Sequence, residues 1–353
     1  MTPLIQNTST HLITGFLGAG KTSFINACIA NMQQGQKWAI LVNEVGQIGI
    51  DEALYKTDDE SPLAIRQVSG GCICCTSQLP LQIALARLLA DNHPDRLWIE
   101  PTGMAHPQEL LSQLAEPHWQ TALSLKSAVS ILNAKQWQQP RYRDHDGYQA
   151  HVRFCDGVVV NRFNELIQSE IADLTAWLNA MNPSATILWQ SSNRFDDIFA
   201  NELQAILAKP SQVLSQRQHY RQVSLMTRGT SMLNRGINTA ASEPENTNPE
   251  LPFRYHDQQA NYQVMGWRLP PDWQVDMIAL MDWLMALPNW QRIKSVVNTN
   301  QNWQTLNFTP DSLDILASEP QVDNRIEIIF LDNTLVLDFA ALDSALMALY
   351  QQD

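Results

Sequence analysis

The chain has few cysteines, no long apolar run and a shortage of positive charge. No stretch contains 18 consecutive apolar residues, so the sequence predicts no membrane-spanning helix. Met1 to Thr10 carries neither a positive cluster nor a long apolar core, so we expect no secretory signal. Lysine and arginine number 23 against 36 aspartate and glutamate, and the net charge of -13 argues against nucleic-acid or anionic-membrane partners.

The five cysteines are unevenly placed. Cys28 and Cys155 stand alone, and we expect them to be small core residues. Cys72, Cys74 and Cys75 crowd into one short stretch, which is typical of a metal or redox site in a reducing compartment rather than a disulfide scaffold. We therefore expect a cytoplasmic protein.

The strongest positive signal is TGFLGAGKTS, residues 14–23, which fits the phosphate-binding pattern G-x-x-x-x-G-K-[ST] between an apolar run and a helix-like segment. Its glycines let successive N–H groups point at phosphate oxygens, and the helix adds its positive N-terminal end. Lys21 would reach the β- and γ-phosphates and Thr22 would bind Mg²⁺. The alternative is a glycine-rich turn before a helix. The predicted phosphate-binding residues are Gly15, Phe16, Leu17, Gly18, Ala19, Gly20, Lys21, Thr22 and Ser23.

Apolar runs alternate with helix-like segments between residues 11 and 208, which predicts an α/β domain with a mostly parallel sheet. The predicted strands are His11 to Thr14, Trp38 to Val42, Leu63 to Val68, Leu97 to Ile99, Ala128 to Leu132, Gly157 to Val160 and Thr186 to Trp189. The predicted helices include Leu79 to Ala90, Gln108 to Leu114, Asn164 to Met181 and Asp196 to Ala208.

Two acids follow predicted strands, where ligands gather on parallel sheets. Glu44 lies in NEVGQIGID, residues 43–51, and would face Mg²⁺, a second metal or an attacking water; an ordinary solvated loop is the alternative. Glu100 precedes Pro101-Thr102-Gly103, and we expect Glu100 to hold Mg²⁺ and Gly103 to offer its N–H to the γ-phosphate. Met104 stands where some GTPases place a water-orienting glutamine, so we expect hydrolysis to be slow or to use another group such as Glu44.

The segment GGCICC, residues 70–75, offers up to three soft thiolate ligands from Cys72, Cys74 and Cys75 for Zn²⁺ or a similar ion. A fourth ligand would come from Glu44, a histidine, water or a receiving protein. Three unremarkable thiols and a redox-active pair are the alternatives. We consider His93, His106 and His118 as further ligands, although a hydrogen-bonded or solvated histidine is more common.

Asn161-Arg162-Phe163-Asn164 has the place and form of the guanine-reading segment N-K-x-D, with two of its three fixed residues changed. Aspartate accepts from both guanine N–H groups, whereas Asn164 adds a competing donor. Guanine selectivity is therefore an open point at this stage, although Arg162 can lay its stem along the base.

Taken in order, ITGFLGAGKTS, NEVGQIGID, GGCICC and IEPTG resemble the CobW-like family of metal-handling phosphate-loop GTPases, particularly its zinc-associated bacterial members. The resemblance covers residues 10–200 closely and the C-terminal part more loosely. It implies nucleotide phosphates at residues 15–22, Mg²⁺ near Thr22 and Glu100, and a transition metal at Cys74 and Cys75 with Cys72 in support.

The chain departs from this family's pattern at two positions. Glu44 matches the first acid of the family segment N-E-x-G-E, but Gln47 replaces the second, and Asn164 replaces the base-reading aspartate. The histidines are scattered rather than gathered in a tract like that of some relatives.

Domain organisation follows from a change in pattern after Lys209. We assign residues 1–210 to the phosphate-loop domain, 211–260 to a partly flexible linker and 261–353 to a smaller α+β domain. In that last domain we predict strands at Tyr262 to Leu269, Arg292 to Asn298, Trp303 to Phe308 and Arg325 to Leu331, and helices at Val275 to Leu287 and Leu342 to Tyr350.

The order of the motifs leads to a functional hypothesis. The cysteine segment lies between two segments that should respond to a γ-phosphate and Mg²⁺, so GTP would favour metal retention and hydrolysis would loosen it. We expect a slow GTPase that uses Lys21, Thr22, Glu44 and Glu100 and delivers Zn²⁺ or a similar ion to a client protein. The alternatives are a metal-buffering or regulatory protein that leaves GTP intact, and an ATPase or kinase.

Overall fold

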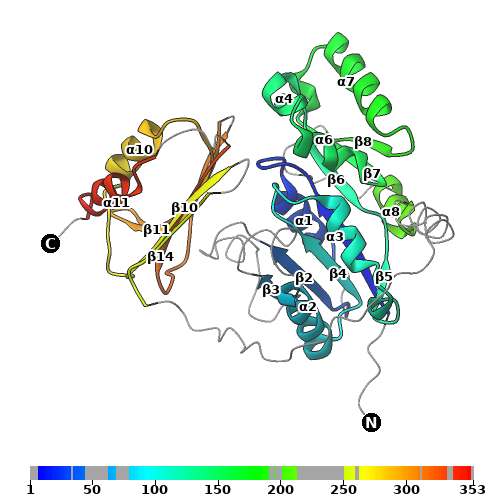
Figure 1. Ribbon diagram of the computed structural model, residues 1–353, viewed down its shortest axis with the longest axis horizontal. Coiled ribbons are helices and arrows are strands. Elements are labelled where there is room, and N and C mark those ends of the chain that lie inside the picture. Colours follow the sequence, from blue (N-terminus) through cyan, green and yellow to red (C-terminus); the bar gives the residue numbers. More distant parts are fainter. Residues whose placement is uncertain are drawn as a thin grey trace, which may run out of the picture.

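The computed structural model describes residues 7–32, 35–43, 63–68, 79–190, 195, 201–212, 250–258, 262–310, 312–331 and 337–350. These residues form a first domain built on a parallel sheet and a second built on an antiparallel sheet (Figure 1). Among the described helices, none is long and apolar enough to cross a membrane.

The sheet of the first domain has eight strands in the order β3-β2-β4-β1-β6-β7-β8, with β5 paired to β1. The pairings are parallel. The strands are β1 (Thr8–Thr14), β2 (Trp38–Asn43), β3 (Leu63–Val68), β4 (Arg96–Glu100), β5 (Leu123–Leu125), β6 (Val129–Asn133), β7 (Gly157–Asn161) and β8 (Thr186–Gln190).

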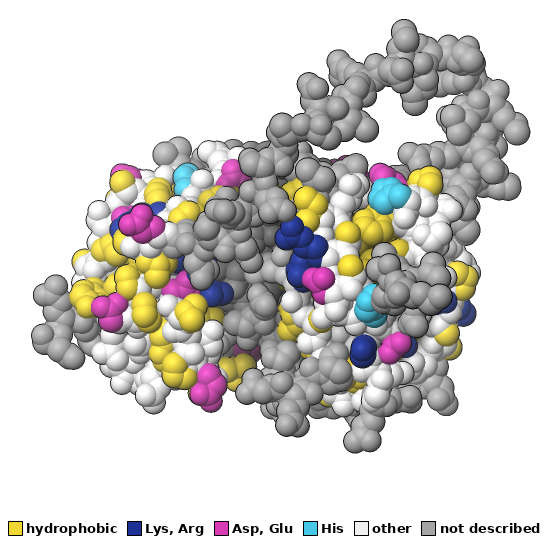
Figure 2. All heavy atoms as spheres, turned by 90° about the horizontal axis from the view of Figure 1, so that it is seen from below, with side chains coloured by type: hydrophobic (Ala, Val, Ile, Leu, Met, Phe, Trp, Pro, Cys, Tyr) yellow, Lys and Arg dark blue, Asp and Glu magenta, His cyan; other side chains and the backbone are white. Residues whose placement is uncertain are grey.

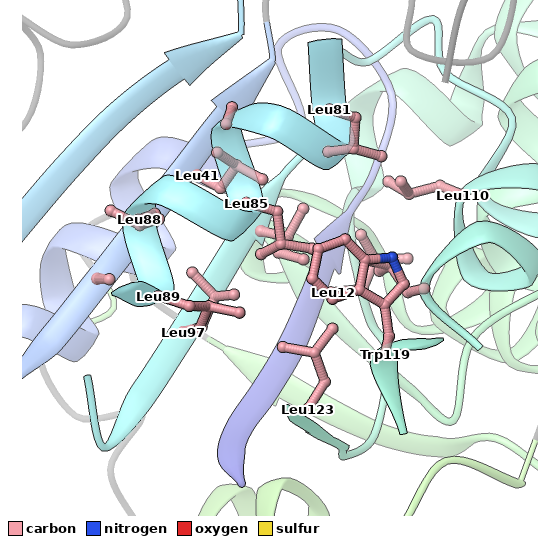
Figure 3. Packing of buried hydrophobic residues seen from close by; sticks show 14 of the residues in the cluster. Leu12, Leu41, Leu81, Leu85, Leu88, Leu89, Leu97, Leu110, Trp119 and Leu123 are labelled. Carbon is pink, nitrogen blue, oxygen red and sulfur yellow. The ribbon is translucent and has the colours of Figure 1, made fainter. Parts of the chain in front are cut away.

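Helices cover both faces of this sheet because its strands are apolar on both sides. Within β2, Leu41 packs with helices α2 and α3 on one face, and Ile40 packs with α1 and α8 on the other (Figure 3 shows the first of these clusters). The helices are α1 (Lys21–Ala30), α2 (Leu79–Asn92), α3 (Pro107–Leu114), α4 (Ala134–Gln138), α5 (Pro140–Arg143), α6 (Asp146–Arg153), α7 (Gln168–Met181) and α8 (Asn201–Ala208), with the short 3₁₀ helices η2 (Pro117–Trp119) and η3 (Phe163–Glu165).

The second domain has a six-stranded antiparallel sheet in the order β13-β12-β11-β14-β10-β9. Its elements are β9 (Phe253–Gln258), β10 (Gln263–Leu269), α10 (Met277–Ala286), β11 (Trp290–Thr299), β12 (Asn302–Thr309), β13 (Ser312–Ala317), β14 (Asn324–Phe330) and α11 (Phe339–Met347). Helices α10 and α11 lie on the side of the sheet that faces away from the first domain (Figure 1).

Strand alternation divides the second sheet into two faces. Ile293 and Ile328 belong to the core shared with α10 and α11. Ile329 and Val264 point the other way and join an apolar cluster with Phe16 of the first domain. The second sheet is therefore packed on both faces, with its own helices on one side and the first domain on the other.

The structure confirms the α/β fold class with a second, smaller domain, and every strand named from the sequence is present. Cys28 and Cys155 are buried free thiols, as predicted. Sequence reasoning missed β5, α4, α5, α6, β9 and β13. Strand β9 lies within residues 211–260, which the sequence analysis assigns to a partly flexible linker, and it extends the second sheet at its edge.

On the face shown in Figure 2, Lys and Arg side chains form small separate groups, and acidic side chains lie singly around them.

Candidate functional site

The candidate site lies at the carboxyl edge of the first sheet, where the chain leaves β1, β4 and β7. Strand β1 sits between β4 and β6, and β2 and β3 lie beyond β4 while β7 and β8 lie beyond β6. The loop after β1 is therefore at the point where strand order changes direction, which is where open α/β sheets bind ligands.

Three glycines give the loop after β1 its shape. Gly15, Gly18 and Gly20 all have positive φ, at 141°, 73° and 100°. A Cβ at Gly15 would lie 2.4 Å from the carbonyl oxygen of Ile131 on β6, so the loop passes against the sheet too closely for any side chain. Helix α1 begins immediately after Gly20, and its N-terminal N–H groups continue the loop.

Lys21 folds back over this loop. Its Nζ donates to the carbonyl oxygen of Gly15 at 2.9 Å, and the side chain is buried. Burial lowers the pKa of Lys21 to about 7, Glu100 opposes that shift, and Arg292 and Lys294 add to it. A cation held this way is stabilised by an anion placed beside it.

Thr22 and Glu100 come from different elements and meet at the start of α1. The Thr22 hydroxyl donates to Glu100 Oε1 at 2.9 Å, and Glu100 ends the buried strand β4. A hydroxyl and a carboxylate are the hard oxygen ligands that Mg²⁺ prefers. These two side chains therefore fit a Mg²⁺ ion beside a phosphate held by the loop.

Gly103 approaches the phosphate loop from the segment after β4. A Cβ on Gly103 would lie 2.4 Å from the backbone nitrogen of Leu17, so only glycine permits this contact. The structure thus brings together Lys21, Thr22, Glu100 and Gly103, all of which the sequence pointed to.

His151 of α6 was missed by the sequence analysis. Its Nδ1 accepts from the Thr14 hydroxyl and from the Gly15 N–H, and its Nε2 contacts the Gly103 carbonyl oxygen at 3.0 Å. A carbonyl only accepts, so this network assigns the proton to Nε2. Burial, chiefly, lowers the pKa of His151 to about 3, so the ring is neutral and ties the two loops together.

The loop after β7 holds the predicted base-reading residues. Asn161 donates from Nδ2 to the carbonyl oxygen of Ala19 at 2.7 Å, so it fastens the phosphate loop. Arg162 has a left-handed φ of 57°, and its Nε lies 3.0 Å from Glu165 Oε1. Asn164 is exposed in η3.

The predicted transition-metal ligands Cys72, Cys74, Cys75 and Glu44 lie outside the described residues, as does Gln47. Within the described part of the chain, no group of three or more His, Cys, Asp or Glu side chains is arranged to hold a metal. His118 lies 3.5 Å from Glu116 and stacks at an angle on Trp119.

The second domain adds charged residues to the same site. One cavity is lined by Leu17, Lys21 and the segment from Glu100 to Gly103 on one side, and by Arg292, Lys294, Glu327 and Ile329 on the other. The strands β11 and β14 supply this second wall.

Comparisons with known proteins show what the chain is similar to. The family described as CobW/HypB/UreG, nucleotide-binding domain, matches residues 9–189. The zinc chaperone YeiR of Escherichia coli (strain K12) is 29% identical over 344 residues, which is 97% of this chain and 98% of YeiR. The zinc chaperone YjiA of the same strain is 31% identical over 183 residues, 50% of this chain and 56% of YjiA.

A solved structure also aligns over nearly the whole chain. The crystal structure of Zn(II)-bound YjiA GTPase from E. coli covers 98% of this chain and 100% of its own, at 16% identity and a TM-score of 0.42. Because the family match spans just over half of the sequence, from before the phosphate loop to the end of β8, the chain belongs to the CobW/HypB/UreG family and carries its nucleotide-binding domain.

Proposed function

We propose that this protein is a slow GTPase that binds Zn²⁺, or a similar transition metal, through Cys72, Cys74 and Cys75 and transfers it to a client protein under nucleotide control. The observation that carries the nucleotide part is the meeting of Lys21, Thr22 and Glu100 at one glycine-rich loop. Support for the metal part comes from the cysteine spacing and from YeiR, a zinc chaperone of nearly the same length.

Each described residue has a distinct task in this proposal. The loop N–H groups and Lys21 bind the β- and γ-phosphates, and Thr22 and Glu100 hold the Mg²⁺ that neutralises developing charge. Gly103 offers its N–H to the γ-phosphate, and His151 keeps the Gly103 segment in register with the loop. The segment after β4 would then respond to loss of the γ-phosphate.

Chain connectivity supports coupling between nucleotide and metal. Glu44 directly follows the end of β2, and Cys72 follows the end of β3 by four residues. Four residues span at most about 14 Å, and both strands end at the edge that carries the phosphate loop. Glu44 is positioned by sequence to orient water or to join the thiolates, so zinc and nucleotide would influence each other's affinity.

The test is single-turnover GTP hydrolysis during a Zn²⁺ titration of the wild type, a Cys74→Ser, Cys75→Ser variant and a Cys28→Ala control that removes a buried thiol. We expect slow hydrolysis that responds to Zn²⁺ in the wild type and the control, and no response in the double variant. Equal Zn²⁺ stoichiometry in all three proteins would show that Cys74 and Cys75 are not the Zn²⁺ ligands.

The second candidate is a metal-buffering or regulatory protein that binds nucleotide without turnover. Gln47 in place of the family's second acid, together with the altered residues Arg162 and Asn164, favours it, and Met104 after Gly103 lacks a group that orients water. Intact GTP after a single-turnover incubation would select this candidate.

Which nucleobase the site recognises is a separate question, since Arg162 and Asn164 depart from the guanine-reading pattern. An ATPase or kinase would use the same phosphate loop. Competition by GTP, ATP and XTP for the site decides which base is read, and we expect GTP to bind most tightly.

A further inference from the structure

Residues of both domains line the cavity beside Lys21, so the nucleotide-binding domain alone does not form it. Lys21, Glu100 and Gly103 form one wall, and Arg292 and Lys294 belong to the other. Groups from the second domain therefore reach the end of the site where a terminal phosphate would lie.

Strand geometry explains why these side chains point at the phosphate loop. Arg292 and Lys294 are two residues apart on β11, so they share the sheet face opposite α10 and α11. In the register of β11 with β14, Lys294 lies opposite Glu327 and Arg292 lies opposite Ile329. Asn307 on the neighbouring β12 accepts from Arg292 Nη2 at 2.9 Å, which fixes the guanidinium on this face.

The two domains meet directly at the phosphate loop. A Cβ on Gly18 would lie 2.6 Å from Cγ2 of Thr309, at the end of β12. Gln291 of β11 donates to the hydroxyl of Tyr142, and both side chains are buried. Ile329 packs in one cluster with Phe16 of the loop. These contacts place the phosphate loop against β12 and β14, and α5 against β11.

Electrostatics favour an anion in this cavity. Lys21, Arg292 and Lys294 are 5%, 9% and 7% exposed, and they face the two carboxylates of Glu100 and Glu327. Arg292 and Lys294 together balance the charges of Glu100 and Glu327, so Mg²⁺ beside Glu100 and a proton on Lys21, whose pKa is about 7, would make the cavity net positive. The arrangement thus suits a multiply charged phosphate.

We propose that Arg292 and Lys294 contact the terminal phosphate of the bound nucleoside triphosphate, so that the triphosphate, unlike the diphosphate, binds across both domains. The negative charge of Glu327 repels the phosphate and so limits the strength of this contact. Loss of the terminal phosphate then removes one of the contacts that hold β11 near the loop.

This inference rests on the proposed function, because it concerns the same nucleotide site, and it adds a reason for the second domain. The contact between the domains increases the affinity for the triphosphate by some factor. By thermodynamic linkage, the bound triphosphate stabilises the contact between the domains by the same factor. A metal-transfer partner that engages the second domain would in this way sense the nucleotide.

The experiment compares the affinities for a non-hydrolysable GTP analogue and for GDP, both with Mg²⁺, by isothermal titration calorimetry. Arg292→Gln and Lys294→Gln should each reduce the ratio of triphosphate to diphosphate affinity by about tenfold or more, since a charge-assisted contact is lost. Glu327→Gln should raise the ratio. Arg292→Lys and Lys294→Arg keep the positive charge, so these variants should retain most of the wild-type ratio of triphosphate to diphosphate affinity.

GDP binding in each variant reports that the site is still folded, and Arg254→Gln is the matched control. Arg254 is on the same sheet, pairs with Asp343 and does not line the cavity. A ratio unchanged in the Arg292, Lys294 and Glu327 variants, or an equal loss for both nucleotides, overturns the inference. A wild type that prefers the triphosphate through these residues but neither hydrolyses GTP nor binds Zn²⁺ overturns only the proposed function.

Discussion

Lys21 should take up a proton when the nucleotide binds. Without phosphate its pKa is about 7, chiefly because burial disfavours the charged form. At pH 8 only about a tenth of the molecules carry the proton. Bound phosphates stabilise the ammonium strongly, so binding at pH 8 should be accompanied by uptake of ~0.9 proton, falling to ~0.1 at pH 6.

The assay is calorimetric titration with a non-hydrolysable GTP analogue and Mg²⁺ in buffers of different ionisation enthalpy. The slope of observed enthalpy against ionisation enthalpy gives the number of protons. Affinity should fall by roughly tenfold per pH unit above pH 7, because the proton must be acquired before or with the phosphate. Lys21→Arg is the matched control, since arginine stays protonated throughout. Uptake near zero in the wild type, or equal uptake in Lys21→Arg, refutes the reasoning.

Three further predictions follow from the same contacts. Gly103→Ala should weaken nucleotide binding roughly tenfold, because its Cβ meets backbone atoms of Leu17; an unchanged Kd contradicts this. The pKa of His151 is about 3 against 6.5 unfolded, so the unfolded chain binds more protons and stability falls as pH drops below 6.5. Between pH 7 and 5 the wild type should lose about 2 kcal/mol more than His151→Gln in urea unfolding; parallel losses would exclude this role. Thr22→Ala and Glu100→Gln should each raise the Mg²⁺ concentration needed for GTP binding, and non-additively; independent effects would show that they do not share one ion.

The parallel sheet could be predicted because its strands are continuous apolar runs. Residues 38–42, Trp-Ala-Ile-Leu-Val, are buried on both faces of β2, so no other element suits them. The phosphate loop could be predicted because its glycines lie within ten consecutive residues, 14–23, and determine the backbone conformation of that same segment. By contrast, β5 is only three residues long, and α4, α5 and α6 are short and polar enough to hide their periodicity.

The residues that complete the site could not be predicted, because their meaning depends on contacts distant in sequence. His151 binds residues more than a hundred positions earlier, and nothing in its own helix indicates this. Arg292 and Lys294 have the pattern of a solvated strand face, yet both are buried and line a cavity whose other wall belongs to the first domain. Strand β9 alternates between half-buried and exposed residues, so its polar sequence resembled a linker.

The second domain contains five tryptophans, Trp267, Trp273, Trp283, Trp290 and Trp303. Trp267 and Trp273 are buried in the core that the sheet shares with α10 and α11. Trp283 and Trp290 pack against that core, and Trp303 packs with Val296 on the other face of the sheet.

Nucleotide control of the metal is the central claim, and the Zn²⁺ dissociation constant measured in the two nucleotide states tests it most directly. With Mg²⁺ present, the wild type should hold Zn²⁺ more tightly with a non-hydrolysable GTP analogue than with GDP, and the Cys74→Ser, Cys75→Ser variant should show no difference. Equal Zn²⁺ affinities of the wild type in both nucleotide states would contradict the claim.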